Sequence, residues 1–79
     1  MKENIYMPRM GQTMTEGTVV KWLKKDGERV KKSDGIVDIM TDKVTTTIES
    51  PIDGYLQIIV EEDNIVPVGK VIGKVFNEY

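Results

Sequence analysis

The apolar residues of this chain occur in short runs separated by turn residues, which is the pattern of β-strands. In residues 44–49 the positions alternate, so Val44, Thr46 and Ile48 fall on one face of a strand. No window carries an apolar stripe at helical spacing. The other expected strands cover residues 4–7, 18–23, 36–40, 55–60, 65–68 and 71–76. We therefore expect an all-β domain of about seven or eight short strands.

Composition strengthens this expectation. The chain has ten Val, nine Ile and seven Thr, but two Leu and no Ala. β-Branched side chains are stiff and fit a pleated surface, whereas Ala and Leu are the leading helix formers. Most of the seven Gly and three Pro fall between the apolar runs, where they end strands and form turns.

The second half of the chain repeats the apolar pattern of the first. The halves align at an offset of 37 residues and, after a single gap expected near Asn64, at an offset of 36. Each motif spans about 35 residues and cannot bury its apolar face alone, so we expect two packed sheets with approximate two-fold symmetry. The aligned pairs are Gly17 with Gly54, Val19 with Leu56, Trp22 with Ile59, Asp26 with Asp63, Val30 with Val66, Ser33 with Gly69, Ile36 with Ile72 and Ile39 with Val75.

The two halves differ where the repeat ends. The second half stops at residues 77–79, whereas the first continues through Thr41, Asp42 and Lys43 into the next expected strand. We therefore expect Asp42 and Lys43 at the tip of a hairpin, at the end of the sandwich opposite the termini. A two-residue turn normally favours Gly, and this one has none, which suggests that its residues serve another purpose.

The chemistry available to the 79 residues is narrow. Neither Cys nor His is present, which excludes disulfides, thiolate metal sites and His-dependent nucleophilic catalysis. The formal net charge of −2 gives no electrostatic reason to bind nucleic acid or an anionic membrane, and no apolar run approaches the roughly 20 residues of a membrane span. We expect residues 1–79 to form one monomeric domain in the bacterial cytoplasm, without catalytic residues, a metal, a nucleic-acid partner or a membrane partner.

Three segments together resemble the lipoyl domains of 2-oxo acid dehydrogenase complexes. They are Met-Pro-Arg-Met-Gly-Gln-Thr-Met-Thr-Glu-Gly-Thr-Val-Val-Lys-Trp at residues 7–22, Asp-Ile-Met-Thr-Asp-Lys-Val at residues 38–44 and Val-Pro-Val-Gly at residues 66–69. The match covers nearly the whole chain in one register. The resemblance implies a barrel-sandwich hybrid, a flattened β-barrel of two roughly four-stranded antiparallel sheets with internal quasi-two-fold symmetry.

The resemblance also implies a cofactor and a set of partners. Lys43 would carry lipoic acid in an amide bond, formed by a lipoate-protein ligase or a lipoyl transferase. The carrier would accept an acyl group from a thiamine-dependent decarboxylase and pass it to coenzyme A at an acyltransferase core. Dihydrolipoyl dehydrogenase would then reoxidise it. The opening Met-Pro segment resembles acyltransferase components of the pyruvate or acetoin type more than those of the 2-oxoglutarate type.

Residues around Lys43 are expected to take part in partner recognition. In the family the acidic neighbour, here Asp42, helps enzymes to identify the lysine, and the loop from Met10 to Glu16 would lie beside the tip. The expected recognition residues are Thr41, Asp42, Val44, Gly11 and Glu16. Three features depart from the family pattern: Met40 stands where an acidic residue is common, Ser33 where a turn Gly is common, and Asp63-Asn64 replaces the usual Gly-Asp. Trp22 is expected to be a packing residue.

Other functions are also compatible with the sequence. A biotinyl carrier domain of a carboxylase uses the same fold, but its lysine lies between methionines, whereas Asp42 and Val44 flank Lys43 here. The lipoyl carrier of the glycine cleavage system is usually longer. A metal site would need Asp34, Asp38 and Asp42, or the acidic residues at 61–63, which lack the spacing of a calcium loop. An unmodified structural or interaction β domain is the remaining alternative.

Overall fold

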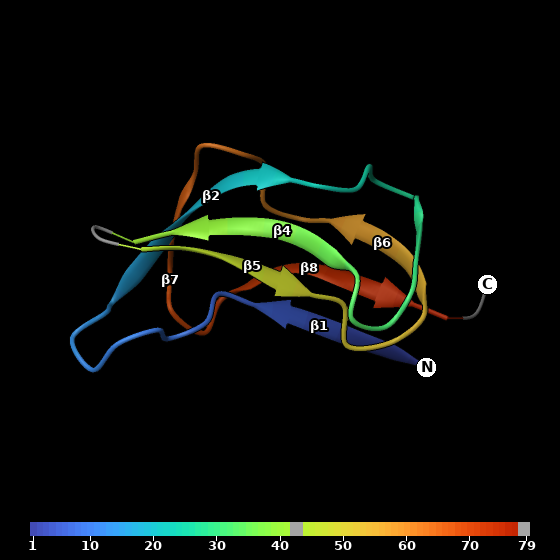
Figure 1. Cartoon of the computed structure of the whole chain (residues 1–79), viewed down its shortest axis with the longest axis horizontal. Coiled ribbons are helices and arrows are strands. Elements are labelled where there is room, and N and C mark those ends of the chain that lie inside the picture. The colour runs from blue at the N-terminus through green and yellow to red at the C-terminus, as the bar shows by residue number, and fades with distance from the viewer. Residues whose placement is uncertain (42–43, 78–79) are drawn as a thin grey trace.

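The computed structural model describes residues 1–41 and 44–77, and this part of the chain is built from eight strands without a helix. Figure 1 shows them as one elongated body, with the N-terminus at one end and the connected ends of β4 and β5 at the other. Asp42 and Lys43 lie outside the described residues. The strands are β1 (Lys2–Tyr6), β2 (Glu16–Trp22), β3 (Arg29–Val30), β4 (Gly35–Met40), β5 (Thr45–Glu49), β6 (Gly54–Ile58), β7 (Ile65–Pro67) and β8 (Val71–Phe76).

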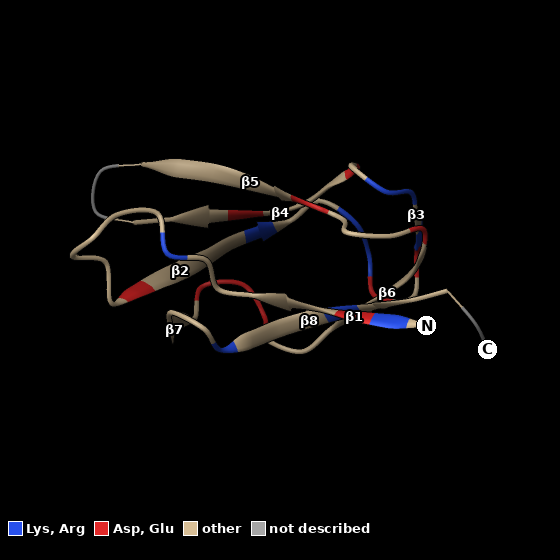
Figure 2. Cartoon of the chain, turned by 90° about the horizontal axis from the view of Figure 1, so that it is seen from below, with Lys and Arg blue, Asp and Glu red and all other residues tan. Residues whose placement is uncertain are grey.

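The strands form two four-stranded antiparallel sheets, with the orders β1-β8-β6-β3 and β5-β4-β2-β7. Figure 2 shows β4 and β5 lying above β1 and β8 as two layers. A single apolar core is contributed by both sheets, and this confirms the expected all-β sandwich. Its members are Ile5, Met7, Val19, Trp22, Val30, Ile36, Val37, Ile39, Leu56, Val66, Ile72 and Val75.

The internal repeat is visible in the sheet order. If β5 is equated with β1, β4 with β8, β2 with β6 and β7 with β3, one sheet order becomes the other. The registers agree as well, because Val19 pairs with Ile39 in one sheet and Leu56 pairs with Val75 in the other. The expected two-fold symmetry is therefore confirmed.

The expected position of the gap in the repeat is wrong. Trp22 pairs with Val37, and its counterpart opposite Gly73 is Ile58 rather than Ile59. The offset has therefore already changed from 37 to 36 between Val19 and Trp22, where the pairing of β2 with β4 is irregular. A β-bulge adds one residue to one strand of a pair. That insertion in β2 accounts for the shift, and no gap is needed near Asn64.

The turns after the bulge confirm the offset of 36. The described residues with positive φ are Gly27 and Ser33 in the first half and Asp63 and Gly69 in the second. They form two pairs, each separated by 36 residues. The equivalent of Gly27 is thus Asp63, and the equivalent of Asp26 is Glu62 instead of the expected Asp63.

Trp22 is a packing residue, as expected. Only 9% of its surface is exposed, and its indole N–H donates to the Val60 carbonyl over 2.9 Å. Residues Thr46 and Ile48 are half-buried, in agreement with the predicted alternation, whereas Val44 precedes β5 and is exposed. The alternation therefore identified the inner face of the strand but placed its start one residue too early.

Candidate functional site

The adjacent ends of β4 and β5 form the predicted hairpin as far as the structure describes it. Met40 pairs with Thr45, and beyond this pair the Thr41 N–H donates to the Val44 carbonyl over 2.8 Å. The Thr41 hydroxyl lies 3.3 Å from the same carbonyl oxygen. Figure 1 places this end of the pair opposite the N-terminus. The prediction that Asp42 and Lys43 form the tip concerns residues outside the described part of the chain.

The other end of the molecule is closed by an equivalent hydrogen bond. There the Asn77 N–H donates to the Met1 carbonyl over 3.0 Å, next to the pair formed by Lys2 and Phe76. Asn77 corresponds to Thr41 at the offset of 36. The same hydrogen bond between the ends of two paired strands therefore occurs at both ends of the fold. In the sequence, Lys43 lies between Thr41 and Val44, the two residues of one of these bonds.

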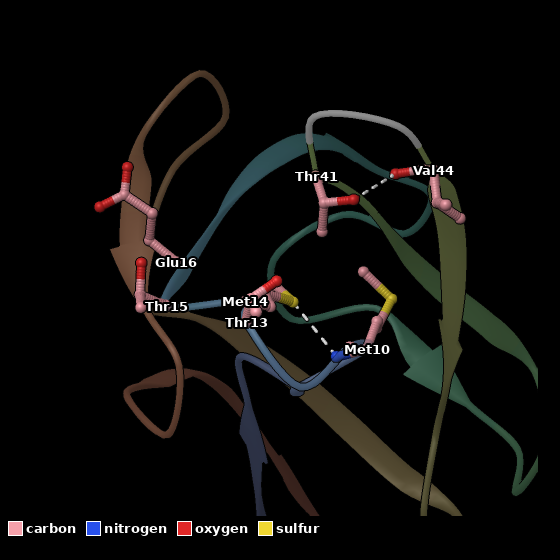
Figure 3. Close-up of a pocket in the computed structure, with 8 residues that line it drawn as sticks. Met10, Thr13, Met14, Thr15, Glu16, Thr41 and Val44 are labelled. Carbon is pink, nitrogen blue, oxygen red and sulfur yellow. Dashed lines mark hydrogen bonds between the residues drawn. The ribbon is translucent and has the colours of Figure 1, made fainter.

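The loop between β1 and β2 lies beside the hairpin, as expected. A surface pocket of about 540 Å³ is lined from both sides, and Figure 3 shows Thr41 and Val44 above the loop that contains Met10 and Met14. Four of the five expected recognition residues, Gly11, Glu16, Thr41 and Val44, line this pocket, and Asp42 lies outside the described residues. The other lining residues are Met10, Thr13, Met14 and Thr15.

A methionine sulfur helps to hold the loop in shape. The Met14 Sδ accepts a hydrogen bond from the Met10 N–H over 3.1 Å, while the Met14 N–H donates to the Gly11 carbonyl over 3.2 Å. Both methionine side chains are half-buried and pack on the core. Sequence reasoning treated them as soft packing groups and missed the sulfur acceptor. Two methionines four residues apart around a Gly were the available signal.

Gly17 connects this loop to the core. A Cβ at position 17 would lie 2.7 Å from the Met7 sulfur and 3.0 Å from the Met14 methyl carbon, both closer than ordinary packing allows. The absence of a side chain therefore lets both methionines approach β2. This packing positions the start of β2, including Glu16, next to the pocket.

The charge of the pocket lining is small. Among the described residues that line it, Glu16 is the one with an ionisable side chain, and the rest are Met, Gly, Thr or Val. This combination suits the positioning of a chain segment or a partner surface.

The acidic residues considered for a metal site have other contacts. Asp34 accepts from the Lys31 N–H over 2.9 Å, Asp38 from the Thr47 hydroxyl over 2.6 Å, and Glu62 from the Trp22 N–H over 2.8 Å. Within residues 1–41 and 44–77, no three His, Cys, Asp or Glu side chains are grouped to hold a metal ion. The same residues include no helix long and apolar enough to cross a membrane.

Comparison with known proteins adds a family to this geometry. The sequence matches the biotin/lipoyl family described as "biotin-requiring enzyme" over residues 3–75. The chain belongs to this family. A structural match narrows the fold: the solution structure of the lipoyl domain of the 2-oxoglutarate dehydrogenase complex from Azotobacter vinelandii has a TM-score of 0.79 and 37% identity. The match covers 94% of this chain and 95% of that domain, so the chain has the fold of a lipoyl carrier domain.

Two relatives are larger components of dehydrogenase complexes. The dihydrolipoyllysine-residue acetyltransferase component of the pyruvate dehydrogenase complex of Mycobacterium bovis is 44% identical over 72 residues, which cover 90% of this chain. The dihydrolipoyllysine-residue succinyltransferase component of the 2-oxoglutarate dehydrogenase complex of Buchnera aphidicola is 45% identical over 71 residues, or 89% of this chain. The matched regions span 13% and 17% of these two relatives.

Proposed function

We propose that Lys43 carries a lipoyl group in an amide bond and that the chain is the swinging-arm carrier domain of a dihydrolipoamide acyltransferase. The main support is the hydrogen bond between Thr41 and Val44, which joins the ends of β4 and β5. Two residues lie between Thr41 and Val44 in the sequence. The second of these is Lys43. The names of the relatives and the lipoyl-domain fold support the choice of cofactor.

The chemistry of the chain fits a covalently added group. With neither Cys nor His in the sequence, the side chains of this domain supply no thiol that could carry an acyl group or be oxidised to a disulfide. Such a sulfur must therefore be added to the chain. When bound, a dithiolane supplies that sulfur chemistry. Amide formation would also remove the positive charge of Lys43. The neighbouring strands β4 and β5 belong to a four-stranded sheet, so the arm would extend from a part of the fold that strand pairing holds in place.

The proposed partners follow from this role. They are a lipoate-protein ligase or lipoyl transferase, a thiamine-dependent decarboxylase that loads the carrier, the acyltransferase core that delivers to coenzyme A, and dihydrolipoyl dehydrogenase. Tethering raises the effective concentration of the arm at each active site, which is the contribution of a carrier without catalytic residues. The pocket formed by Gly11, Glu16, Thr41 and Val44 is the proposed recognition surface, with Asp42 beside it in the sequence.

We also propose that the complex is of the pyruvate or acetoin type. The Met-Pro segment at residues 7–22 supports this proposal, whereas the two relatives above differ by one percentage point in identity. Purified decarboxylases for pyruvate, acetoin and 2-oxoglutarate should separate the types when each is given the lipoylated chain. We expect transfer from the pyruvate or acetoin enzyme, and transfer from the 2-oxoglutarate enzyme alone would contradict the proposal.

Intact-mass spectrometry tests the attachment site. We expect the chain to gain the mass of one lipoyl group when incubated with lipoate, ATP and a lipoate-protein ligase. Lys43→Arg should abolish the gain, whereas Lys70→Arg, an exposed lysine elsewhere, should retain it. A biotinyl gain with biotin and a biotin-protein ligase would favour the biotinyl carrier instead. The absence of any gain with a ligase that modifies a known lipoyl domain would contradict the proposal.

A further inference from the structure

Two exposed apolar side chains, Met40 and Ile65, lie on either side of the half-buried Thr18, next to the hairpin on the sheet β5-β4-β2-β7. Thr18 of β2 pairs with Met40 of β4 on one side and with Ile65 of β7 on the other. Directly opposed residues in antiparallel strands project from the same face of the sheet. Met40 is 44% exposed and Ile65 is 63% exposed, so this face points to solvent. We call Met40, Thr18 and Ile65 the apolar row.

The apolar row borders the hairpin directly. A small surface hollow of about 190 Å³ is lined by all three of its residues together with Glu16, Gly17 and Thr41. Glu16 and Thr41 also line the larger pocket on the loop side. The hairpin end is therefore flanked by two hollows, one bordered by the β1–β2 loop and the other by the apolar row.

The two-fold symmetry of the fold provides an internal comparison. The counterparts of Met40, Thr18 and Ile65 are Phe76, Tyr55 and Arg29, which pair in the same order across β8, β6 and β3. There the Arg29 guanidinium carbon lies 5.9 Å from the centre of the Tyr55 ring, and Tyr55 and Phe76 are half-buried. The fold thus accepts a charged residue at the position of Ile65. An exposed Ile at this position is not required by strand pairing, and together with the exposed Met40 it forms an apolar patch beside the hairpin.

The length of the lysine side chain indicates which partner makes that contact. Extended lysine spans about 6 Å from Cα to Nζ, and a lipoyl group in amide linkage roughly doubles that reach. Enzymes that act on the far end of the arm can work at that distance from the strands. A ligase must bring its active site to the lysine Nζ itself. Its surface must then come against residues that border the hairpin, which include Met40 and Ile65.

We infer that the apolar row is a docking surface for the lipoate-protein ligase that modifies Lys43. This inference rests on the proposed function. Met40 and Ile65 provide apolar anchors, and the nearby Glu16 provides a negative charge for a basic group on the ligase. Two of the three row residues lie far from Lys43 in the sequence, so recognition would extend beyond the residues that flank the lysine.

Initial rates of lipoylation of the unmodified chain by a purified ligase test the inference, with intact mass as the readout. Ile65→Arg introduces the residue type found at the two-fold related position, Arg29 of β3, which the fold accepts. Ile65→Ala removes the apolar side chain without adding a charge. We expect each to lower kcat/KM for the chain by about tenfold, as loss of an interface anchor does. The matched control is Ile59→Arg, because Ile59 is 45% exposed and lines a separate hollow with Trp22 and Glu62.

The possible results have distinct meanings. If the unmodified wild-type chain is not lipoylated, the proposed function itself fails. If it is lipoylated and both Ile65 variants, shown folded by thermal melting, react at the wild-type rate, the inference is overturned. An equal loss in Ile59→Arg would also overturn it, since the effect would then be one of general surface charge. Fully lipoylated Ile65→Ala should accept acyl groups from the decarboxylase at the wild-type rate, and a loss confined to that step would assign the row to the decarboxylase instead.

Discussion

The carboxylate of Glu62 accepts the backbone N–H of Trp22 over 2.8 Å, across 40 positions of sequence. The two-fold related contact joins Asp26 to the Ile58 N–H, also over 2.8 Å. Each half of the repeat therefore supplies a carboxylate that satisfies a strand N–H in the other half. Glu62 lies in the connection from β6 to β7 and Asp26 in the connection from β2 to β3, and both connections pass from one sheet to the other, so each contact fixes such a connection to a strand.

Removal of the Glu62 carboxylate should destabilise the domain. Glu62→Ala leaves the partly buried Trp22 N–H without its acceptor, which costs about 1–3 kcal/mol of the free energy of unfolding. Urea denaturation followed by Trp22 fluorescence measures the loss. Glu61→Ala is the matched control, since Glu61 is exposed and neighbours Glu62, and its change should stay within about 0.5 kcal/mol. Equal effects of the two substitutions would argue against a specific role of Glu62.

Gly54→Ala should be severely destabilising. A Cβ at residue 54 would lie 2.1 Å from the Phe76 carbonyl oxygen, and a backbone atom cannot move aside as a flexible side chain can. We expect a loss of at least about 3 kcal/mol in the free energy of unfolding, or failure to fold. Gly11→Ala is the control, because nothing lies within 4 Å of its Cβ position. Equal thermal melting of Gly54→Ala and the wild type would show that β6 and β8 are not this close.

Ser33→Gly should stabilise the domain. Ser33 has a φ of 77°, a left-handed conformation that costs a residue with a Cβ about 1 kcal/mol, and its two-fold equivalent is Gly69 with a φ of 91°. We expect a gain of about 0.5–1 kcal/mol by urea denaturation. The reciprocal change, Gly69→Ser, should lose a similar amount. Lys32→Gly is the control, because Lys32 is one residue away and has no positive φ, so its stability should not rise. A gain in stability for Lys32→Gly would show that the effect at Ser33 does not come from its positive φ.

Met14→Leu should loosen the loop without unfolding the domain. Leucine keeps most of the apolar volume but removes the sulfur that accepts the Met10 N–H. A weak hydrogen bond is worth about 0.5–1 kcal/mol, so exchange of the Met10 amide proton should become roughly two- to fivefold faster. Nuclear magnetic resonance can follow that proton. Met40→Leu is the control, since Met40 lies on β4 outside this contact. If the exchange rate of the Met10 amide proton is unchanged in Met14→Leu, the Met14 sulfur does not help to hold the loop in shape.

Much of the fold can be predicted from the sequence, because the alternation of side chains along each strand and its repetition in the second half are visible in the sequence itself. The alternation at residues 44–49 identified a strand with Thr46 and Ile48 on the inner side, and the half-buried state of both agrees. The repeat identified the two-fold symmetry, because residues that occupy equivalent core positions, such as Val19 and Leu56, must both be apolar. The placement of the β1–β2 loop beside the hairpin came from the family resemblance.

The tertiary structure decided what depends on pairing between distant segments. The bulge in β2 moved the gap of the repeat from the expected Asn64 to the segment between Val19 and Trp22, since an extra residue becomes a bulge only through the register of its partner strand. The sulfur contact of Met14 depends on the path of a loop packed over Gly17. The spacing of Met10 and Met14 around Gly11 is compatible with the sulfur contact but does not specify it, and no local pattern marks the bulge.

By itself the sequence predicted Lys43 as an attachment site only through its resemblance to lipoyl domains, whereas it determined the all-β domain with two equivalent halves directly. Side-chain period and β-branched composition are sufficient for that, because they reflect the backbone conformation of each segment. Only the tertiary structure brought Met40, Thr18 and Ile65 into one row. These residues come from three strands, and the hydrogen-bond register that aligns them exists only after both sheets have formed.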